Sequence, residues 1–203
     1  MVKELTGCDT GVTSPPQNRA LMPKYLKWTL ISIGFVALLA FVGFRYMTSQ
    51  TKKASPEETT TFVVDDLKVE VTYSRPFKKG RAIFGTLVPY GKVWRTGANE
   101  ATTFTVNKDV TFGEAPLKAG TYTLWTIPNE DEWLVILNGK MYGWGVNFDG
   151  VAQRDPMADV AKAKAPVRRT DAITEQFTIS VEGSPSELVL RWDDVQVQVP
   201  LKH

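Results

Sequence analysis

Residues 67–73 read LKVEVTY and alternate strictly between apolar and polar side chains. Successive side chains of a β-strand point to opposite faces, so this spacing predicts a strand with one face buried in a core. Similar patterns recur in seven further segments: residues 103–106, 120–127, 132–137, 142–148, 173–181, 187–192 and 195–199. About eight short strands are typical of an all-β sandwich or barrel.

Short turn-forming clusters such as KKG from Lys78, KAG from Lys118 and NGK from Asn138 separate these segments. No long helical pattern lies between the strands, which favours antiparallel hairpins over parallel βαβ units. Residues 155–165 are ambiguous, because Asp-Pro is typical of a helix start. Alanines alternating with lysines favour an edge strand there. We therefore predict a mainly β fold, an antiparallel β-sandwich, in which Trp133 and Trp192 are in phase with buried neighbours.

An uncharged, proline-free run, WTLISIGFVALLAFVGF, lies between Lys27 and Arg45. At ~1.5 Å per residue it covers about 25 Å, and flanking amphipathic residues extend it to bilayer thickness. A cleaved signal peptide is the alternative, but the run is long for one and no small-residue cleavage site follows it. We predict a polar tail at residues 1–23, a transmembrane helix at 24–47, a tether at 48–61 and a β-domain at 62–203.

The simplest topology leaves the short tail in the bacterial cytoplasm and the large domain in the periplasm, as a single-pass protein of the inner membrane. Cys8, the only cysteine, lies in the tail, so the domain has no disulfide or thiol redox chemistry. Small residues along the helix would allow another helix to approach closely in lipid. They are Gly34, Ala37, Ala40 and Gly43.

Several functional classes lack their residues in this sequence. The net charge is +2 with both signs interspersed, which argues against a nucleic-acid partner. The sequence has a single histidine, His203, at its last position. Histidine-dependent nucleophilic mechanisms and Cys/His zinc sites are therefore excluded. We expect no cofactor, metal site or catalytic residue. A carboxylate-based hydrolase remains an alternative, with Glu100 as its best residue.

The densest group of chemically versatile side chains lies in residues 87–104, LVPYGKVWRTGANEATTF. The candidates for ligand or partner binding are Tyr90, Trp94, Arg95, Asn99 and Glu100, together with Arg75 and Arg81 from the preceding segment. In one interpretation Trp94 plugs an end of the sandwich and its polar neighbours satisfy loop backbone. In the other, the arginines bind a carboxylate or phosphate. The tryptophans also admit stacking on a glycan.

The segments YSRPFKKGRAIFGTLVPYGKVWRTGANEATTFTVNKDVTF and LKAGTYTLWTIPNEDEWLVILN resemble an uncharacterised bacterial envelope family, DUF2911, over about residues 62–201. The resemblance implies a compact, mostly β domain outside the cytoplasm and supplies no activity. Members typically look like exported proteins with a cleavable signal, so a retained anchor is a departure. The family motif falls on Arg75, Arg81, Tyr90, Trp94, Arg95, Gly97, Asn99 and Glu100.

The leading functional hypothesis is an accessory or scaffold subunit of a larger membrane complex, such as a respiratory or photosynthetic electron-transfer assembly. Its partners would be the lipid bilayer and other subunits, reached through the helix, the tail and the β-domain. One alternative is an envelope module that binds a glycan or small anion through the loop from Tyr90 to Glu100. The other is the carboxylate-based hydrolase.

Overall fold

The computed structural model describes residues 23–203 in two compact units that meet between Arg45 and Tyr46. Residues 1–22 of the predicted tail, with Cys8, lie outside the described residues. Helix α1 (Lys24–Ala54) is the one helix in the described part that is long and apolar enough to cross a membrane. By length and composition it fits a membrane anchor or a signal sequence. The small residues Gly34, Ala37, Ala40 and Gly43 are exposed along it.

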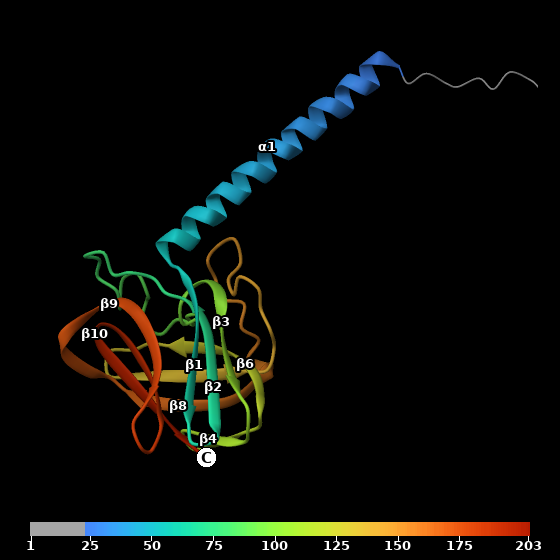
Figure 1. Cartoon of the computed structure of the whole chain (residues 1–203). Coiled ribbons are helices and arrows are strands. Elements are labelled where there is room, and N and C mark those ends of the chain that lie inside the picture. Colours follow the sequence, from blue (N-terminus) through green and yellow to red (C-terminus); the bar gives the residue numbers. More distant parts are fainter. Residues whose placement is uncertain (1–22) are drawn as a thin grey trace, which may run out of the picture. The chain divides into compact units, whose positions relative to one another are not determined.

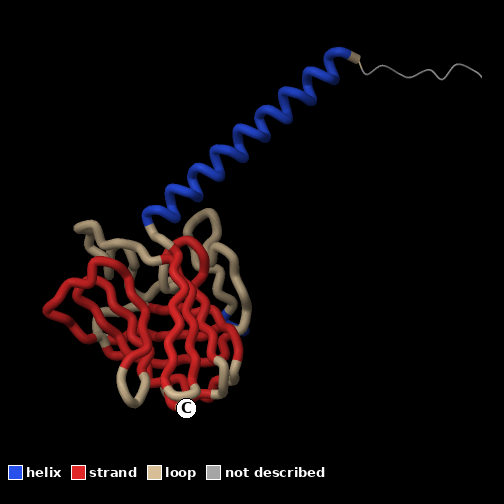
Figure 2. The backbone as a smooth tube through the Cα atoms, viewed as in Figure 1, coloured by secondary structure: helices blue, strands red, loops and turns tan. Residues whose placement is uncertain are grey.

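The second unit is built from two antiparallel sheets, as the alternating pattern predicted (Figures 1 and 2). The larger sheet has the order β1 (Glu57–Val64), β2 (Leu67–Ser74), β3 (Ala98–Val106), β6 (Gly120–Ile127), β7 (Glu132–Asn138) and β8 (Asp159–Pro166). The smaller sheet has the order β5 (Ala115–Leu117), β4 (Val110–Phe112), β10 (Glu187–Lys202) and β9 (Arg168–Glu182). A short 3-10 helix, η1 (Pro156–Ala158), precedes β8.

The core lies between the sheets and is filled by alternate residues of each strand. Leu67, Val69, Val71 and Tyr73 of β2 are all buried, whereas the residues between them are more exposed. Each fully buried apolar side chain contributes about 1.5–3 kcal/mol relative to exposure. Trp133 and Trp192 are also buried, as their phase predicted.

The structure differs from the sequence-based expectation in three segments. Residues 48–61 form no tether, because α1 continues to Ala54 and β1 begins at Glu57. Residues 142–148 form an irregular loop instead of a strand, since glycines and Asn147 turn the chain there. Residues 187–202 form one bulged strand, β10, instead of two. In the contested segment, Asp155 caps the short helix η1, as the Asp-Pro pair indicated, and the alternating alanines and lysines form strand β8, as favoured.

Two long connections, residues 75–97 and 139–158, emerge from the sandwich at the end opposite the carboxyl terminus (Figure 2). The turn between β1 and β2 lies at the other end, where His203 Nε2 is 3.9 Å from Asp65 Oδ2. Long loops at one end of a rigid sandwich are a common location for binding residues. This end therefore holds the candidate site.

Candidate functional site

The two long connections line most of an open pocket of about 940 Å³ in the second unit. Its lining comes from residues 76–98, from residues 146–152, from Trp192 of β10, and from Ala54 and Ser55 at the end of α1. The volume falls within the range of small-molecule sites, about 300–1,000 Å³. All seven predicted binding residues lie on or near the first connection, and three of them, Arg81, Trp94 and Arg95, line this pocket.

Trp94 contributes an aromatic wall to the pocket. Its backbone pairs with Thr126 through bonds of 2.7 and 3.0 Å, and its indole Nε1 donates to the Gly97 carbonyl at 3.0 Å. The ring stacks on buried Trp192 with centroids 5.9 Å apart and planes at 16°. A Cβ on Gly97 would lie 3.0 Å from the Ser74 carbonyl oxygen, so only glycine fits without displacement. The Trp94 turn is therefore fixed from three sides.

The pocket lining is basic. Lys79, Arg81, Lys92 and Arg95 contribute to it, and no acidic residue does among the described residues. Arg95 donates from Nη1 to the Trp144 carbonyl at 3.4 Å. Burial lowers the pKa of Arg95, and the charge of Glu100 opposes that shift. Arg81 donates to the carbonyls of Lys78 and Phe77, at 3.0 and 2.5 Å. The two arginines are thus held by neutral carbonyl acceptors, and no acid in the lining offsets their charge.

Arg75 and Tyr90 do not line the pocket. Arg75 joins β2 to β9 by donating to the Phe177 carbonyl at 3.1 Å and to Thr178 Oγ1 at 2.9 Å, and it is ion-paired with Glu58. The Tyr90 ring packs against Gly85 instead. These two members of the predicted set therefore hold the fold locally.

Asn99 and Glu100 bind the end of α1 that belongs to the second unit. Asn99 has φ +55° and donates from Nδ2 to the Ser55 carbonyl at 3.2 Å, which satisfies a carbonyl at the helix end. Glu100 Oε1 lies 2.9 Å from Lys52 Nζ. Burial alone would raise the pKa of Glu100, but bonds from Lys52 and Ser74 outweigh it and lower the pKa. A carboxylate that stays ionised is poorly suited to donating a proton as a general acid.

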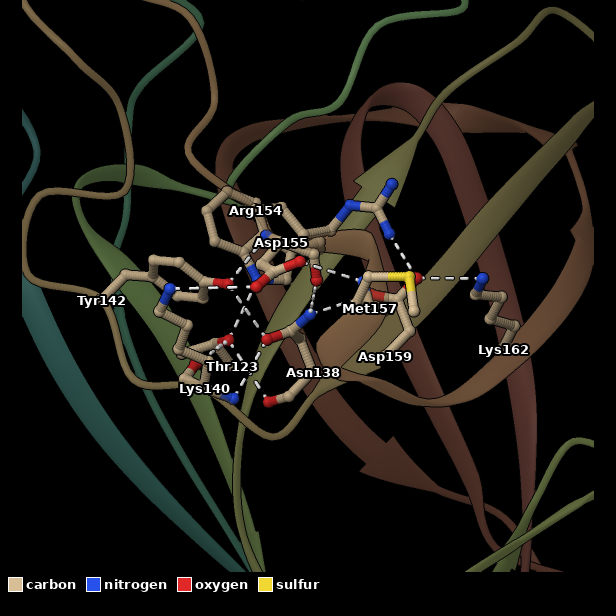
Figure 3. Close-up of polar contacts among 10 residues, drawn as sticks. Thr123, Asn138, Lys140, Tyr142, Arg154, Asp155, Met157, Asp159 and Lys162 are labelled. Atoms are coloured by element: carbon tan, nitrogen blue, oxygen red, sulfur yellow. Dashed lines mark hydrogen bonds and ion pairs between the residues drawn. The ribbon is translucent and has the colours of Figure 1, made fainter.

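A second polar cluster, which the sequence did not reveal, surrounds Asn138 at the end of β7 (Figure 3). The buried Asn138 amide donates to the Asp155 carbonyl at 2.8 Å and to Asp159 Oδ1 at 2.9 Å. Its oxygen accepts from the Lys140 backbone at 3.0 Å and from the Tyr142 hydroxyl at 3.2 Å. All four hydrogen-bonding positions of the side chain are used, so the cluster fixes the start of the second connection.

Asp159 is the charged centre of this cluster (Figure 3). Its side chain is 3% exposed, and its Oδ2 accepts from Arg154 at 2.5 Å and lies 2.9 Å from Lys162 Nζ. Burial alone would raise the pKa of Asp159, but the bonds from Asn138, Lys162 and Arg154 outweigh it and lower the pKa. The NGK motif at Asn138 predicted only a turn, and no local signal links it to Asp159.

The tryptophans proposed for glycan stacking differ in exposure. Trp125, Trp133 and Trp192 are buried, whereas Trp144 is 40% exposed. Among these residues, only Trp144 leaves a large part of its side chain accessible for stacking on a glycan, and it lies in the connection 139–158, not on a sheet. Within residues 23–203 no group of three or more His, Cys, Asp or Glu side chains is placed to hold a metal ion.

Comparison with known proteins gives one family and no individual relative. Neither the search of curated proteins nor that of solved structures found a match. The family model of DUF2911, described as a protein of unknown function, matches residues 55–201. That range begins at Ser55, seven residues before the predicted domain start, and so includes β1. Because this match covers more than half of the chain and takes in the whole β-sandwich almost to its end, the chain belongs to the DUF2911 family.

Proposed function

We propose that the chain is a membrane-anchored binding domain whose pocket takes an anionic ligand with an aromatic or apolar part. The observation that carries this proposal is the pairing of four basic residues with a stacked tryptophan wall in a cavity that has no acidic lining. Basic side chains beside an indole face suit a flat or apolar anion, because charge and stacking act on different parts of the ligand.

The fold supports a site that is formed before the ligand arrives. Trp94 is held by Thr126, Gly97 and Trp192, and Arg95 is held against the Trp144 carbonyl. A preformed site spends little conformational entropy on binding. Burial also strengthens the charge-assisted hydrogen bonds that Arg95 offers to an anion.

The test uses the full chain in non-ionic detergent and titration calorimetry. Naphthalene disulfonate is the probe, and naphthalenediol is the uncharged control of the same shape. Arg95→Gln removes one pocket cation, and Lys164→Gln removes an exposed lysine of β8 outside the pocket. We expect binding of the disulfonate but not the diol. Arg95→Gln should weaken it about tenfold or more, from a charged hydrogen bond worth ~1.5–3 kcal/mol. Equal effects of the two substitutions would refute the site.

The accessory-subunit role stays a second proposal, favoured by a specific observation. Asn99 and Glu100 are both committed to residues 52–55, which ties the sandwich to the end of α1 within one unit. Such a tie suits a subunit held by its helix, in the inner membrane with the domain in the periplasm. Extraction in mild detergent should recover the chain in a large stable complex, and a monodisperse monomer would count against this role. The carboxylate-based hydrolase has no comparable support, since Glu100 is paired with Lys52.

A further inference from the structure

One exposed aromatic side chain has no contact that would explain its position. Phe148 is 111% exposed, at the tip of residues 146–152, here named the Phe148 finger. Single exposed apolar residues are ordinary on protein surfaces. Here, however, Val151 of the same finger and the nearby Trp144 are 61% and 40% exposed, and Leu87 on the pocket rim is 45% exposed. Two of these exposed apolar residues, Leu87 and Val151, line the pocket, and Phe148 lies in the same finger as Val151.

The finger is built to hold its tip outward. Val146 and Ala152 pair as a β-bridge, and the Asn147 backbone nitrogen donates to the Val151 carbonyl at 2.9 Å. Asn147 Oδ1 accepts from the backbone nitrogens of Asp149 and Val151, at 3.0 and 2.9 Å. Gly150 takes φ +78°, which few other residues adopt. These local bonds fix the turn without using the Phe148 side chain.

The Phe148 finger and the end of helix α1 border the same pocket, and this position suggests which surface covers the finger. Val151 and Gly150 line the same pocket as Ala54 and Ser55, the residues at which α1 ends. Residues 46–54, the last of which lines this pocket, lead to it from Arg45, which closes the apolar run. As helix they span about 14 Å at ~1.5 Å per residue. The finger thus emerges on the end of the domain that connects directly to the apolar helix.

The charges on this end are also suitable for a lipid surface. Lys79, Arg81 and Lys92 lie on the same pocket and would face anionic headgroups. Asp149 at the tip opposes this attraction, although Asn147 Nδ2 donates to its carboxylate at 3.4 Å. Aromatic side chains are favoured at the headgroup level of a bilayer. Basic residues around an aromatic tip are the combination that interfacial binding uses.

We propose that the Phe148 finger inserts into the headgroup region of the bilayer that α1 crosses, so that the pocket opens at the membrane surface. This inference rests on the proposed membrane anchoring but not on the proposed ligand. The bilayer is the proposed occupant because so few residues separate the apolar run from the pocket that Val151 and Gly150 of the finger line.

The test uses the full chain with Cys8→Ser in nanodiscs of mixed zwitterionic and anionic phospholipid. A nitroxide is attached to Phe148→Cys or, as the matched control, to Val63→Cys. Val63 is also exposed, at 66%, but lies at the far end of β1, beside the turn to β2. We expect the label at residue 148 to collide more with oxygen and less with a water-soluble nickel chelate than the label at residue 63. Equal accessibility of the two labels would overturn the proposal.

A second measurement isolates the role of the aromatic ring. A nitroxide at Val151→Cys should lose its protection from the nickel chelate when Phe148→Asp is added, and unchanged protection would overturn the assignment of Phe148. The naphthalene disulfonate titration of the Arg95→Gln chain is independent of both labels. If the labels show no membrane contact but the titration succeeds, the finger proposal fails and the proposed ligand site stands. If the chain does not enter nanodiscs, the proposed membrane anchor and the finger proposal both fail.

Discussion

The cluster around Asn138 and the pocket around Trp94 both place charged groups beside aromatic rings, but only the first is closed. Asp159 is surrounded by Arg154, Lys162 and Asn138, and its charge is matched within the protein. The pocket has four basic residues and no acid in its lining. The same chain therefore contains a polar cluster, around Asn138, whose charges are paired within the protein, and a basic pocket whose charge no acidic residue in its lining balances.

The largest expected loss of stability comes from a substitution that breaks the closed cluster around Asn138. Asp159→Asn leaves the buried Arg154 without its counter-charge, and removing one partner of a buried pair costs about 3–5 kcal/mol. Chemical denaturation of the full chain in detergent measures the free energy of unfolding. Asp109→Asn is the matched control, because Asp109 pairs with Lys118 on the exposed surface, where solvent screens the pair, and its loss should cost much less than that of Asp159. Similar losses in both variants would contradict the contrast.

The next effect tests how rigidly the pocket wall is held. Gly97→Ala forces a Cβ against the Ser74 carbonyl and should cost about 2–3 kcal/mol while displacing Trp94. Gly80→Ala is the control, with φ +69° and open space at its Cβ, and strain alone should cost about 1–2 kcal/mol. The same denaturation assay measures both, and near-ultraviolet circular dichroism reports the Trp94 environment. An unchanged aromatic signal for Gly97→Ala would show that the wall is not fixed as described.

A smaller change in stability is expected when a pocket residue is substituted, which tests the contrast between the pocket and the cluster. Arg95→Gln should change the free energy of unfolding by less than ~1 kcal/mol, because its guanidinium has no carboxylate partner within 4 Å among the described residues. The same substitution should weaken the naphthalene disulfonate titration. A loss comparable to that of Asp159→Asn would mean that the pocket is a second structural cluster.

The smallest effect concerns Glu182, which is paired like Asp159 but remains partly exposed. Hydrogen bonds from Arg191 and Ser180 lower the pKa of Glu182 from 4.5 to about 2. Because the folded pKa is depressed, the stabilisation is fully present above pH 4.5 and is lost as the pH falls toward 2. Solvent screening keeps it below ~1 kcal/mol. Glu182→Gln should therefore destabilise slightly at pH 7 and not at pH 2, and a constant difference across that range would contradict it.

Strand positions were predictable where one face is buried, because alternation in β2 and β8 reports directly on the core. The same rule failed at residues 142–148, where Trp144, Val146 and Phe148 alternate but glycines and the Asn147 turn bend the chain outward. The strands β4 and β5 have three residues each, too few for a period to register.

The candidate site was only partly accessible to sequence reasoning. Trp94 and Arg95 were recognised by residue type, but Lys79 and Lys92 line the pocket beside them only through the folding of the connection 75–97. Asn99 was expected to bind loop backbone, and its partner is the Ser55 carbonyl, 44 positions earlier. The Asn138–Asp159 bond spans 21 positions with no periodic signal. Long-range side-chain bonds of this kind depend on topology, which a local pattern does not contain.

The placement of β10 makes the pocket depend on the end of the chain. Residues 187–202 pair with both β9 and β4, and Trp192 backs the aromatic wall that faces the connections 75–97 and 139–158. A nascent chain lacking this strand would have neither the centre of the smaller sheet nor the support for Trp94. The smaller sheet and the backing of the aromatic wall are therefore complete only when residues 187–202 are in place, so the shape of the pocket depends on the last strand of the sandwich.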